Sequence, residues 1–280
     1  MQMPYHRKLT YAVNYGSGNY LIRGEFCTTL LGIALRIGTI AMSALRPRAQ
    51  RGAFPQGTQH YGRSLLGAPL IWFPATVAGP QSGLIIAGTH GDENSSVVTL
   101  SCALRALAPE LRRHHVILAV NPDGCQLGLR ANANGVDLNR NFPSANWKAG
   151  ETVYRWNSAA EQRDVVLLTG SRPGSEPESR GLCQLIHQIN PAWVVSFHDP
   201  LACIEDSRNS ELGQWLSNAF TLPLVSSVGY ETPGSFGSWC EDIGLHCITA
   251  EFPPVSSDEA SENYLDAMTQ LLHWQPANHK

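Results

Sequence analysis

The chain has 280 residues, of which 43% are hydrophobic and 15% charged, which is typical of a soluble globular protein with a sizeable core and excludes intrinsic disorder or a collagen-like repeat. A formal net charge of -3 gives no overall basic field, so the sequence predicts no binding to nucleic acid or to anionic membranes. Small molecules or peptides are the expected substrates.

The first 45 residues differ from the rest of the chain. Basic residues precede an apolar stretch at 26–45, which superficially resembles a signal sequence. Arg36 interrupts this stretch, and a central arginine opposes membrane insertion by roughly 2.5 to 3.5 kcal/mol. We therefore interpret 1–45 as an N-terminal extension, with the hypothesis that it lies upstream of a working start at Met42, and expect one domain from 46 to 280.

From residue 46 onward, short apolar runs alternate with helical patterns, which predicts an α/β domain with a mixed, mostly parallel central sheet flanked by helices. A capping box of Ser175 and Glu178 is expected to open the second helix, and Gly, Ser and Pro residues between 143 and 177 predict an excursion over the surface. The predicted strands, each apolar enough to be buried on both faces, are 70–73, 84–87, 116–120, 193–197 and 247–250. The predicted helices are 95–107, 176–189, 210–219 and 258–273.

Seven cysteines are scattered along the chain without paired short spacings. An odd number in this arrangement predicts neither a disulfide framework nor a cysteine metal site. Small buried thiols in a reducing compartment are the simpler interpretation.

The strand predicted at 84–87 leads into a glycine-rich turn that carries His90 and Glu93, three residues apart and just before a predicted helix. Both side chains would lie at the carboxyl edge of the sheet, where open α/β folds bind ligands. An imidazole and a carboxylate that reach one point are a plausible pair of zinc ligands. The alternative is that this spacing arises by chance, because a histidine in a turn is more often a surface residue.

The segment 129–143 places Arg130 and Arg140 among amides, with no apolar periodicity that would explain it as core. Guanidinium groups bind carboxylates through two parallel hydrogen bonds and stabilise oxyanions. Surface arginines are the usual alternative, but the run NRNFP at its end predicts a fixed loop.

Two further apolar strands end in residues that the same chemistry needs. His198 would bring a third ligand to the edge, and two histidines with one carboxylate are typical of a catalytic zinc site with an open fourth position. Burial would raise the pKa of Glu251 and suit it to take a proton from water and pass it to a leaving amine. The alternatives are a core histidine at 198 and a solvated glutamate at 251. Against them, three apolar strands each end in a residue that the same reaction would need.

Seven residues, taken in chain order, resemble the site of the zinc carboxypeptidase (M14) family: His90, Glu93, Arg130, Asn139, Arg140, His198 and Glu251. The resemblance covers residues 46–274. More narrowly, the segments GTHGDENSS, GLRANANGVDLNRNFP, SEPES, SFHDP and TAEFPP are similar to the bacterial branch of that family that hydrolyses murein tripeptide in the cytoplasm during peptidoglycan recycling.

The resemblance implies that one Zn²⁺ per chain is held by His90, Glu93 and His198. It also implies that Glu251 acts as general base and then as general acid, and that Arg130 polarises the scissile carbonyl. The implied reaction is hydrolysis of the amide between γ-D-glutamate and meso-diaminopimelate (Dap) in L-Ala-γ-D-Glu-meso-Dap.

The resemblance also implies how the substrate is held. Asn139 and Arg140 would bind its terminal carboxylate, and Tyr230 falls where a mobile tyrosine contacts substrate in the digestive members. Three acidic residues are candidates to meet the second amino group of diaminopimelate, with a surface role as the alternative for each: Glu205, Asp206 and Glu231.

Two other functions stay open. A deacylase similar to aspartoacylase or succinylglutamate desuccinylase shares a His-Gly-x-Glu motif with a later histidine, although the long excursion after DLNRNFP favours the carboxypeptidase. A peptide-binding module without turnover could have kept the same fold. The expected partner is a small peptide, with no nucleic acid and no membrane, and a homodimer is a further expectation.

Overall fold

A computed structural model describes residues 9–15, 18–24, 45–156 and 160–277. The chain divides into two compact units, Met1–Leu45 and Arg46–Lys280. In the first unit, β1 (Leu9–Tyr15) and β2 (Gly18–Gly24) pair as an antiparallel hairpin. The apolar stretch predicted at 26–45, apart from its last residue, and the hypothetical start at Met42 lie outside the described residues.

The second unit is built on a six-stranded mixed sheet in the order β11-β10-β12-β9-β5-β6. Four neighbouring strands, β12, β9, β5 and β6, run parallel, and β10 is antiparallel to β12. This arrangement confirms the predicted α/β fold class. The strands are β5 (Leu84–Ile86), β6 (His115–Ile117), β9 (Val194–His198), β10 (Cys203–Glu205), β11 (Leu224–Val225) and β12 (Cys247–Glu251).

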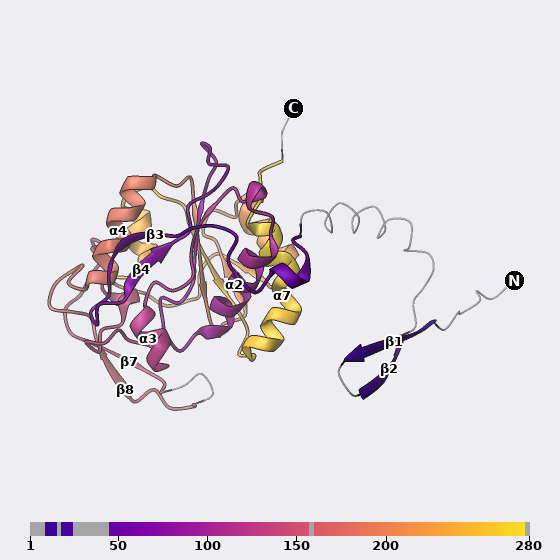
Figure 1. The fold of residues 1–280 in the computed structure, drawn as a ribbon. Helices are drawn as coiled ribbons and strands as arrows, with labels where there is room; N and C mark the ends of the chain where they lie inside the picture. The colour runs from indigo at the N-terminus through magenta and orange to yellow at the C-terminus, as the bar shows by residue number, and fades with distance from the viewer. Residues whose placement is uncertain (1–8, 16–17, 25–44, 157–159, 278–280) are drawn as a thin grey trace, which may run out of the picture. The chain divides into compact units, whose positions relative to one another are not determined.

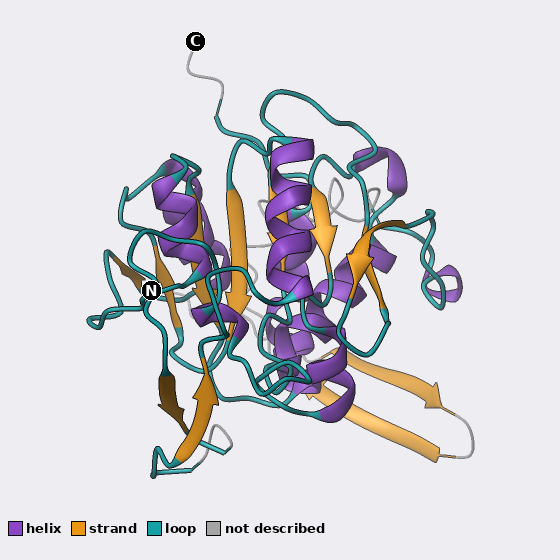
Figure 2. Cartoon of the chain, turned by 90° about the vertical axis from the view of Figure 1, so that its left-hand side faces the viewer, coloured by secondary structure: helices purple, strands orange, loops and turns teal. Residues whose placement is uncertain are grey.

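Helices cover both faces of this sheet (Figures 1 and 2). In Figure 1, α4 lies on one side of the strands and α2 and α7 lie on the other. All four predicted helices are present within two residues of the expected ends. They are α2 (Asn94–Ala106), α4 (Pro177–Ile189), α5 (Glu211–Phe220) and α7 (Ser257–Leu271), to which the structure adds α3 (Pro122–Leu127) and α6 (Phe236–Asp242).

No helix in the described part of the chain is long and apolar enough to cross a membrane. Ser210 and Ser256 cap α5 and α7, because each hydroxyl accepts a hydrogen bond from a backbone N–H in the first helical turn.

One apolar cluster fills the space between the sheet and the pair α4 and α6. Leu84 and Val194 of the sheet pack there with Leu182 of α4 and Phe236 of α6, and all four are at most 2% exposed. Burying an aliphatic or aromatic side chain of this size contributes about 1.5–3 kcal/mol. The strands are therefore held firmly between two helical layers, and their ends are fixed in place.

Two segments differ in part from the sequence analysis. The strand predicted at 70–73 is present but is not buried on both faces, because β4 (Pro69–Trp72) pairs antiparallel with β3 (Gln59–Arg63) in a separate sheet, and only Phe73 bridges to Val116 of the central sheet. Burial alternates along β4, so one side faces outward. The predicted surface excursion at 143–177 contains a second antiparallel hairpin of β7 (Glu151–Tyr154) and β8 (Val165–Leu168).

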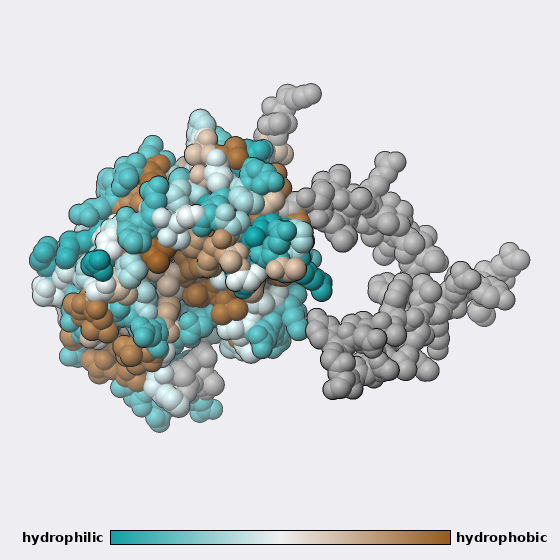
Figure 3. All heavy atoms as spheres, viewed as in Figure 1, coloured by the Kyte–Doolittle hydropathy of each residue, from teal (hydrophilic) through white to brown (hydrophobic). Residues whose placement is uncertain are grey.

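The β7–β8 hairpin carries exposed apolar side chains. The face drawn in Figure 3 is largely hydrophilic, with an apolar area over the part where Figure 1 places α3, β7 and β8. Leu127, Val153 and Val166 of these elements are all about half exposed. Sequence analysis did not predict the hairpin, because its strands are only four residues long and lie in a stretch rich in glycine, serine and proline.

The predicted capping box at the start of α4 is wrong. Proline occupies the first position of the helix, and Glu176 is its N-cap residue without a side-chain capping bond. Glu178 instead accepts hydrogen bonds from the Leu65 backbone N–H (2.9 Å) and from the Asn132 side chain (3.2 Å), and Glu176 also accepts one from Asn132 (2.8 Å). These carboxylates therefore fix the loop that follows Arg130.

The turn after β5 packs against α3 at a glycine. A Cβ atom on Gly91 would stand 2.0 Å from the carbonyl carbon of Gly124 and 2.3 Å from the backbone nitrogen of Cys125. Both neighbours are backbone atoms, which cannot swing away as a flexible side chain can. This close approach sets the position of the residues on either side of Gly91.

We expect Gly91→Ala to lower the free energy of unfolding by about 3 kcal/mol, because the added methyl group forces the turn away from α3. Gly57→Ala is the matched control, since no atom lies within 4 Å of the Cβ position there, and its effect should stay within about 0.5 kcal/mol. Urea unfolding followed by circular dichroism measures both. Equal stabilities of the two variants would contradict this account.

Candidate active site

Three buried side chains converge at the carboxyl edge of the sheet. Nδ1 of His90 lies 2.8 Å from one carboxylate oxygen of Glu93, and Nδ1 of His198 lies 2.9 Å from the other. The two Nδ1 atoms are 3.2 Å apart, and the three ligand atoms lie within 4.8 Å of one another. Two imidazole nitrogens and a carboxylate directed at one point form a donor set that suits zinc.

Each of these three side chains is positioned by a strand end or a helix start. His90 follows β5 in the turn that Gly91 fixes, and His198 is the last residue of β9, the strand that pairs directly with β5 in the parallel part of the sheet. Glu93 is the N-cap residue of α2 but makes no capping hydrogen bond, so its carboxylate is available to the two histidines. All three are at most 6% exposed.

Outer hydrogen bonds orient both imidazole rings. Nε2 of His90 lies 3.1 Å from a carboxylate oxygen of Asp137, and Nε2 of His198 lies 3.1 Å from the hydroxyl of Ser196. Partners of this kind turn the other ring nitrogen toward the metal and raise its basicity. Asp199 does not take this role, since it accepts a hydrogen bond of 2.6 Å from Ser95.

The charges around this group act on one another strongly. Burial disfavours the ionised carboxylate of Glu93, but His90 and His198 outweigh that effect and hold its pKa well below the usual range. Burial and Arg130 lower the pKa of His90, yet Glu93 and Asp137 raise it further, to about 9. An entering metal ion therefore competes with a proton for His90.

Arg130 is a fixed cation beside this group. Its guanidinium donates to Glu93 (2.8 Å) and to Asp137 (3.4 Å), and it lies 3.4 Å from the ring centroid of Tyr154. Burial lowers the pKa of Arg130, but the two carboxylates raise it by more, so the group keeps its charge. The stacking on Tyr154 and the ion pairs leave it little freedom to move.

Glu251 ends β12 directly beside His198, its register partner on β9. It is 9% exposed, and the Leu201 backbone N–H donates to one of its oxygens at 3.3 Å. Burial, with a smaller contribution from Glu93, raises the pKa of Glu251 to about 7. A carboxyl with this pKa can take up and release a proton near neutrality.

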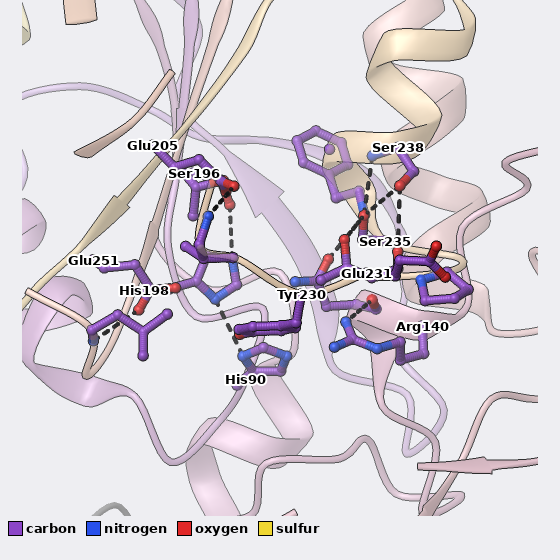
Figure 4. Close-up of a pocket in the computed structure, with 18 of the residues that line it drawn as sticks. His90, Arg140, Ser196, His198, Glu205, Tyr230, Glu231, Ser235, Ser238 and Glu251 are labelled. Atoms are coloured by element: carbon purple, nitrogen blue, oxygen red, sulfur yellow. Dashed lines mark hydrogen bonds between the residues drawn. The ribbon is translucent and has the colours of Figure 1, made fainter. Parts of the chain in front are cut away.

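Asn139 and Arg140 lie in a short 3₁₀ turn further along the same cavity. The side-chain oxygen of Asn139 accepts from the Phe236 backbone N–H at 2.9 Å, and no other described residue holds its amide nitrogen. Tyr230 is 52% exposed and, in the view of Figure 4, lies between His198 and Arg140. These groups offer donors that suit a carboxylate.

One cavity of about 640 Å³, a volume in the range of small-molecule sites, is lined by all the residues predicted to bind metal, transfer protons or hold the substrate carboxylate. Of the three acidic candidates, Glu205 and Glu231 line it and Asp206 does not. Sequence analysis missed three residues that support them. Asp137 stands two residues before Asn139 in a motif that was already singled out, and Ser196 stands two before His198, on the same face of β9. Tyr154 had no signal, because its strand β7 was not predicted.

Comparisons with known proteins agree with this geometry. A family model described as zinc carboxypeptidase matches residues 55–200. The protein named Murein peptide amidase A from Escherichia coli (strain K12) is 81% identical over 235 residues, which cover 84% of this chain and 97% of that protein. The one from Vibrio campbellii is 53% identical over 233 residues, which cover 83% and 94%.

Solved structures give the same result. The crystal structure of murein-tripeptide amidase from Escherichia coli O157 has a TM-score of 0.82 and 81% identity, covering 84% of this chain and 99% of that one. Carboxypeptidase A from Helicoverpa armigera is 14% identical with a TM-score of 0.57, covering 90% of this chain and 82% of that one. The second likeness is one of fold alone.

Zinc added to the metal-free protein at neutral pH is expected to displace about one proton per ion, because His90, with a pKa of about 9, is protonated there. Asp137→Asn should reduce this release, since Asp137 helps to raise that pKa, and should weaken zinc binding about 10–100-fold. Calorimetry in buffers of different ionisation enthalpy measures both quantities.

Asp266→Asn on the exposed side of α7 is the control, and it should behave as the unaltered protein does. Proton release that is absent, or that is the same in the Asp137 and Asp266 variants, would show that the charge balance around His90 is misassigned.

Proposed function

The chain belongs to the zinc carboxypeptidase (M14) family, and from this premise we propose that it is a zinc-dependent amidase that hydrolyses the γ-D-glutamyl–meso-diaminopimelate bond of murein tripeptide. Relatives named Murein peptide amidase A match almost their whole length to this chain. The observation that most supports this activity is that a three-ligand group, a buried carboxyl and fixed guanidinium groups border a single cavity.

We assign the metal to His90, Glu93 and His198. Bound zinc supplies a Lewis acid that polarises water and the substrate carbonyl. The three side chains fit the ion because they are buried, carry two nitrogens and one oxygen as donors, and are held by Asp137 and Ser196 in the orientation that directs both Nδ1 atoms to one point.

We assign proton transfer to Glu251. Its carboxylate takes a proton from the attacking water and then delivers that proton to the nitrogen of the leaving diaminopimelate. A general base that becomes a general acid within one turnover works best when its pKa is near the working pH, and burial supplies that match here.

We assign binding of the substrate to the guanidinium and amide groups of the cavity. Arg130, fixed by Glu93 and Asp137, stabilises the negative charge that develops on the carbonyl oxygen. Asn139 and Arg140 bind the carboxylate at the end of the substrate. Tyr230, whose side chain is half exposed at the edge of the cavity, contacts the substrate from the solvent side.

We place the reaction in the cytoplasm, as a step of peptidoglycan recycling. The six cysteines in the described part of the chain are free thiols, which suits a reducing compartment. The expected product is free meso-diaminopimelate together with the dipeptide L-Ala-D-Glu.

Incubation with L-Ala-γ-D-Glu-meso-Dap should release meso-diaminopimelate, and a zinc chelator should stop that release, because the polarising ion is removed. Mass spectrometry of the free amino acid measures it, and readdition of zinc should restore the activity. A zinc-loaded protein that leaves the tripeptide intact would refute the assignment, and N-acyl amino acids would then test the deacylase alternative. Zinc binding without turnover of any peptide would favour a binding module.

Glu251→Gln should lower kcat by about 10²–10⁴-fold and yet stabilise the metal-free protein in alkaline solution. The folded pKa of Glu251, about 7, lies above the ordinary value of 4.5, so ionising the carboxylate in the folded state costs stability as the pH rises through 7. The neutral glutamine avoids this cost. The gain should be about 1–3 kcal/mol at about pH 8.5 and should vanish below about pH 4.5.

Glu262→Gln on the exposed side of α7 is the matched control, and it should change neither turnover nor stability. Unfolding by urea at the two pH values measures the difference. An unchanged stability in the Glu251 variant at alkaline pH would mean that the carboxyl titrates normally, and full turnover would remove it from catalysis.

A further inference from the structure

The register of the central sheet places a second polar row beside the row that carries His198 and Glu251. Residues two positions apart in a strand point to the same face, about 6.7 Å apart. Two positions before His198 and Glu251, on β9 and β12, stand Ser196 and Thr249, and Glu205 of β10 pairs with Thr249. All three line the same cavity as the catalytic row.

Glu205 is the one carboxylate of this second row. One of its oxygens, Oε1, accepts a hydrogen bond of 2.9 Å from the Val228 backbone N–H, which fixes the side chain. No hydrogen bond from another described residue reaches its other oxygen, Oε2. Figure 4 shows Glu205 and Ser196 on the same side of His198, away from His90. The carboxylate is therefore both anchored and available to a ligand.

Two neighbouring acidic residues do not have these properties. Asp206 is 2% exposed, and its oxygens already accept hydrogen bonds from His246 (2.9 Å) and from the backbone and hydroxyl of Ser210 (2.7 Å each). The side chain of Glu231 is 88% exposed, with Lys148 at 3.8 Å. Asp206 has no capacity left for a ligand, and Glu231 is screened by water.

The distance between the two rows suits a side chain of a particular length. Diaminopimelate has three methylene groups between its two amino-acid centres, which place the second centre about 5 Å from the first and its amino group about 6 Å from it in the extended form. A hydrogen bond of about 2.8 Å then joins this amino group to a carboxylate oxygen. An ammonium group at the end of such a side chain reaches Glu205 when the scissile amide lies beside Glu251.

We propose that Glu205 determines the specificity for the leaving amino acid by binding the second amino group of diaminopimelate. This inference rests on the proposed function, since it concerns the same cavity and the same substrate. A bond between an ammonium group and an anchored carboxylate discriminates against side chains that lack the charge, because an apolar side chain would cover the half-buried carboxylate of Glu205 and give its Oε2 no partner.

Three tripeptides test this role: L-Ala-γ-D-Glu followed by meso-diaminopimelate, by L-lysine or by L-norleucine. Lysine and norleucine differ chiefly in the terminal ammonium group. Glu205→Gln should raise KM for the diaminopimelate and lysine peptides about 10–100-fold, with little change in kcat, because the contact is remote from the reacting atoms. The norleucine peptide should be cleaved as well as by the unaltered enzyme.

Glu241→Gln is the matched control, since Glu241 also lines the cavity but is exposed on α6. The glutamine at 205 can still accept the hydrogen bond from Val228, and thermal unfolding checks that the fold is kept. An equal loss on all three peptides would show that Glu205 only supports the structure. A selective loss in the Glu241 variant instead would move the role to that residue. Either result overturns the inference and leaves the proposed function intact.

Failure of the proposed function gives a different result. If the unaltered zinc-loaded enzyme cleaves none of the three peptides, the amidase assignment fails, and the role of Glu205 fails with it. Cleavage of the norleucine peptide as fast as the diaminopimelate peptide by the unaltered enzyme would keep the amidase activity and exclude recognition of the second amino group.

Discussion

The parallel pairing of β5, β9 and β12 is the constraint on which the rest of the structure depends. Because these strands run in the same direction, their carboxyl ends meet at one edge, and each contributes a polar residue there. Apolar cores on both faces hold the strands, so His198 and Glu251 keep their register. A shift by one residue would turn both side chains to the opposite face.

The charges at this edge are balanced at a cost in stability. Two buried carboxylates, Glu93 and Asp137, are compensated by Arg130 and by the imidazole of His90. Burial raises the pKa of Glu251 toward neutrality, and the opposing effect of His198 is too small to offset it. Natural enzymes commonly accept a strained or destabilised group where the chemistry requires one. Ion pairs therefore fix the side chains around the metal ligands, whereas the buried carboxylate of Glu251, which transfers the proton, lowers the stability of the folded protein.

Sequence analysis could locate the site because long apolar runs identify buried strands, and a polar residue at the end of each run is conspicuous. His198 and Glu251 stood out for this reason. Asp137 and Ser196 did not, because supporting hydrogen bonds depend on how a loop and a strand meet in space. The short strand β10 also escaped, since its pairing with β12, which lies far along the chain, and not local propensity, makes it a strand.

The two polar rows on β9, β12 and β10 separate two kinds of evolutionary change. Substitutions at Glu205 and Thr249 alter the part of the cavity that these two residues line but leave the backbone that carries His198 and Glu251 in place, because both rows belong to one sheet. Ser196 is the exception in this row, since its hydroxyl contacts the ring of His198. A descendant of this gene can thus acquire a preference for a different leaving amino acid through exchanges at those two positions, while its hydrolytic residues are inherited unaltered.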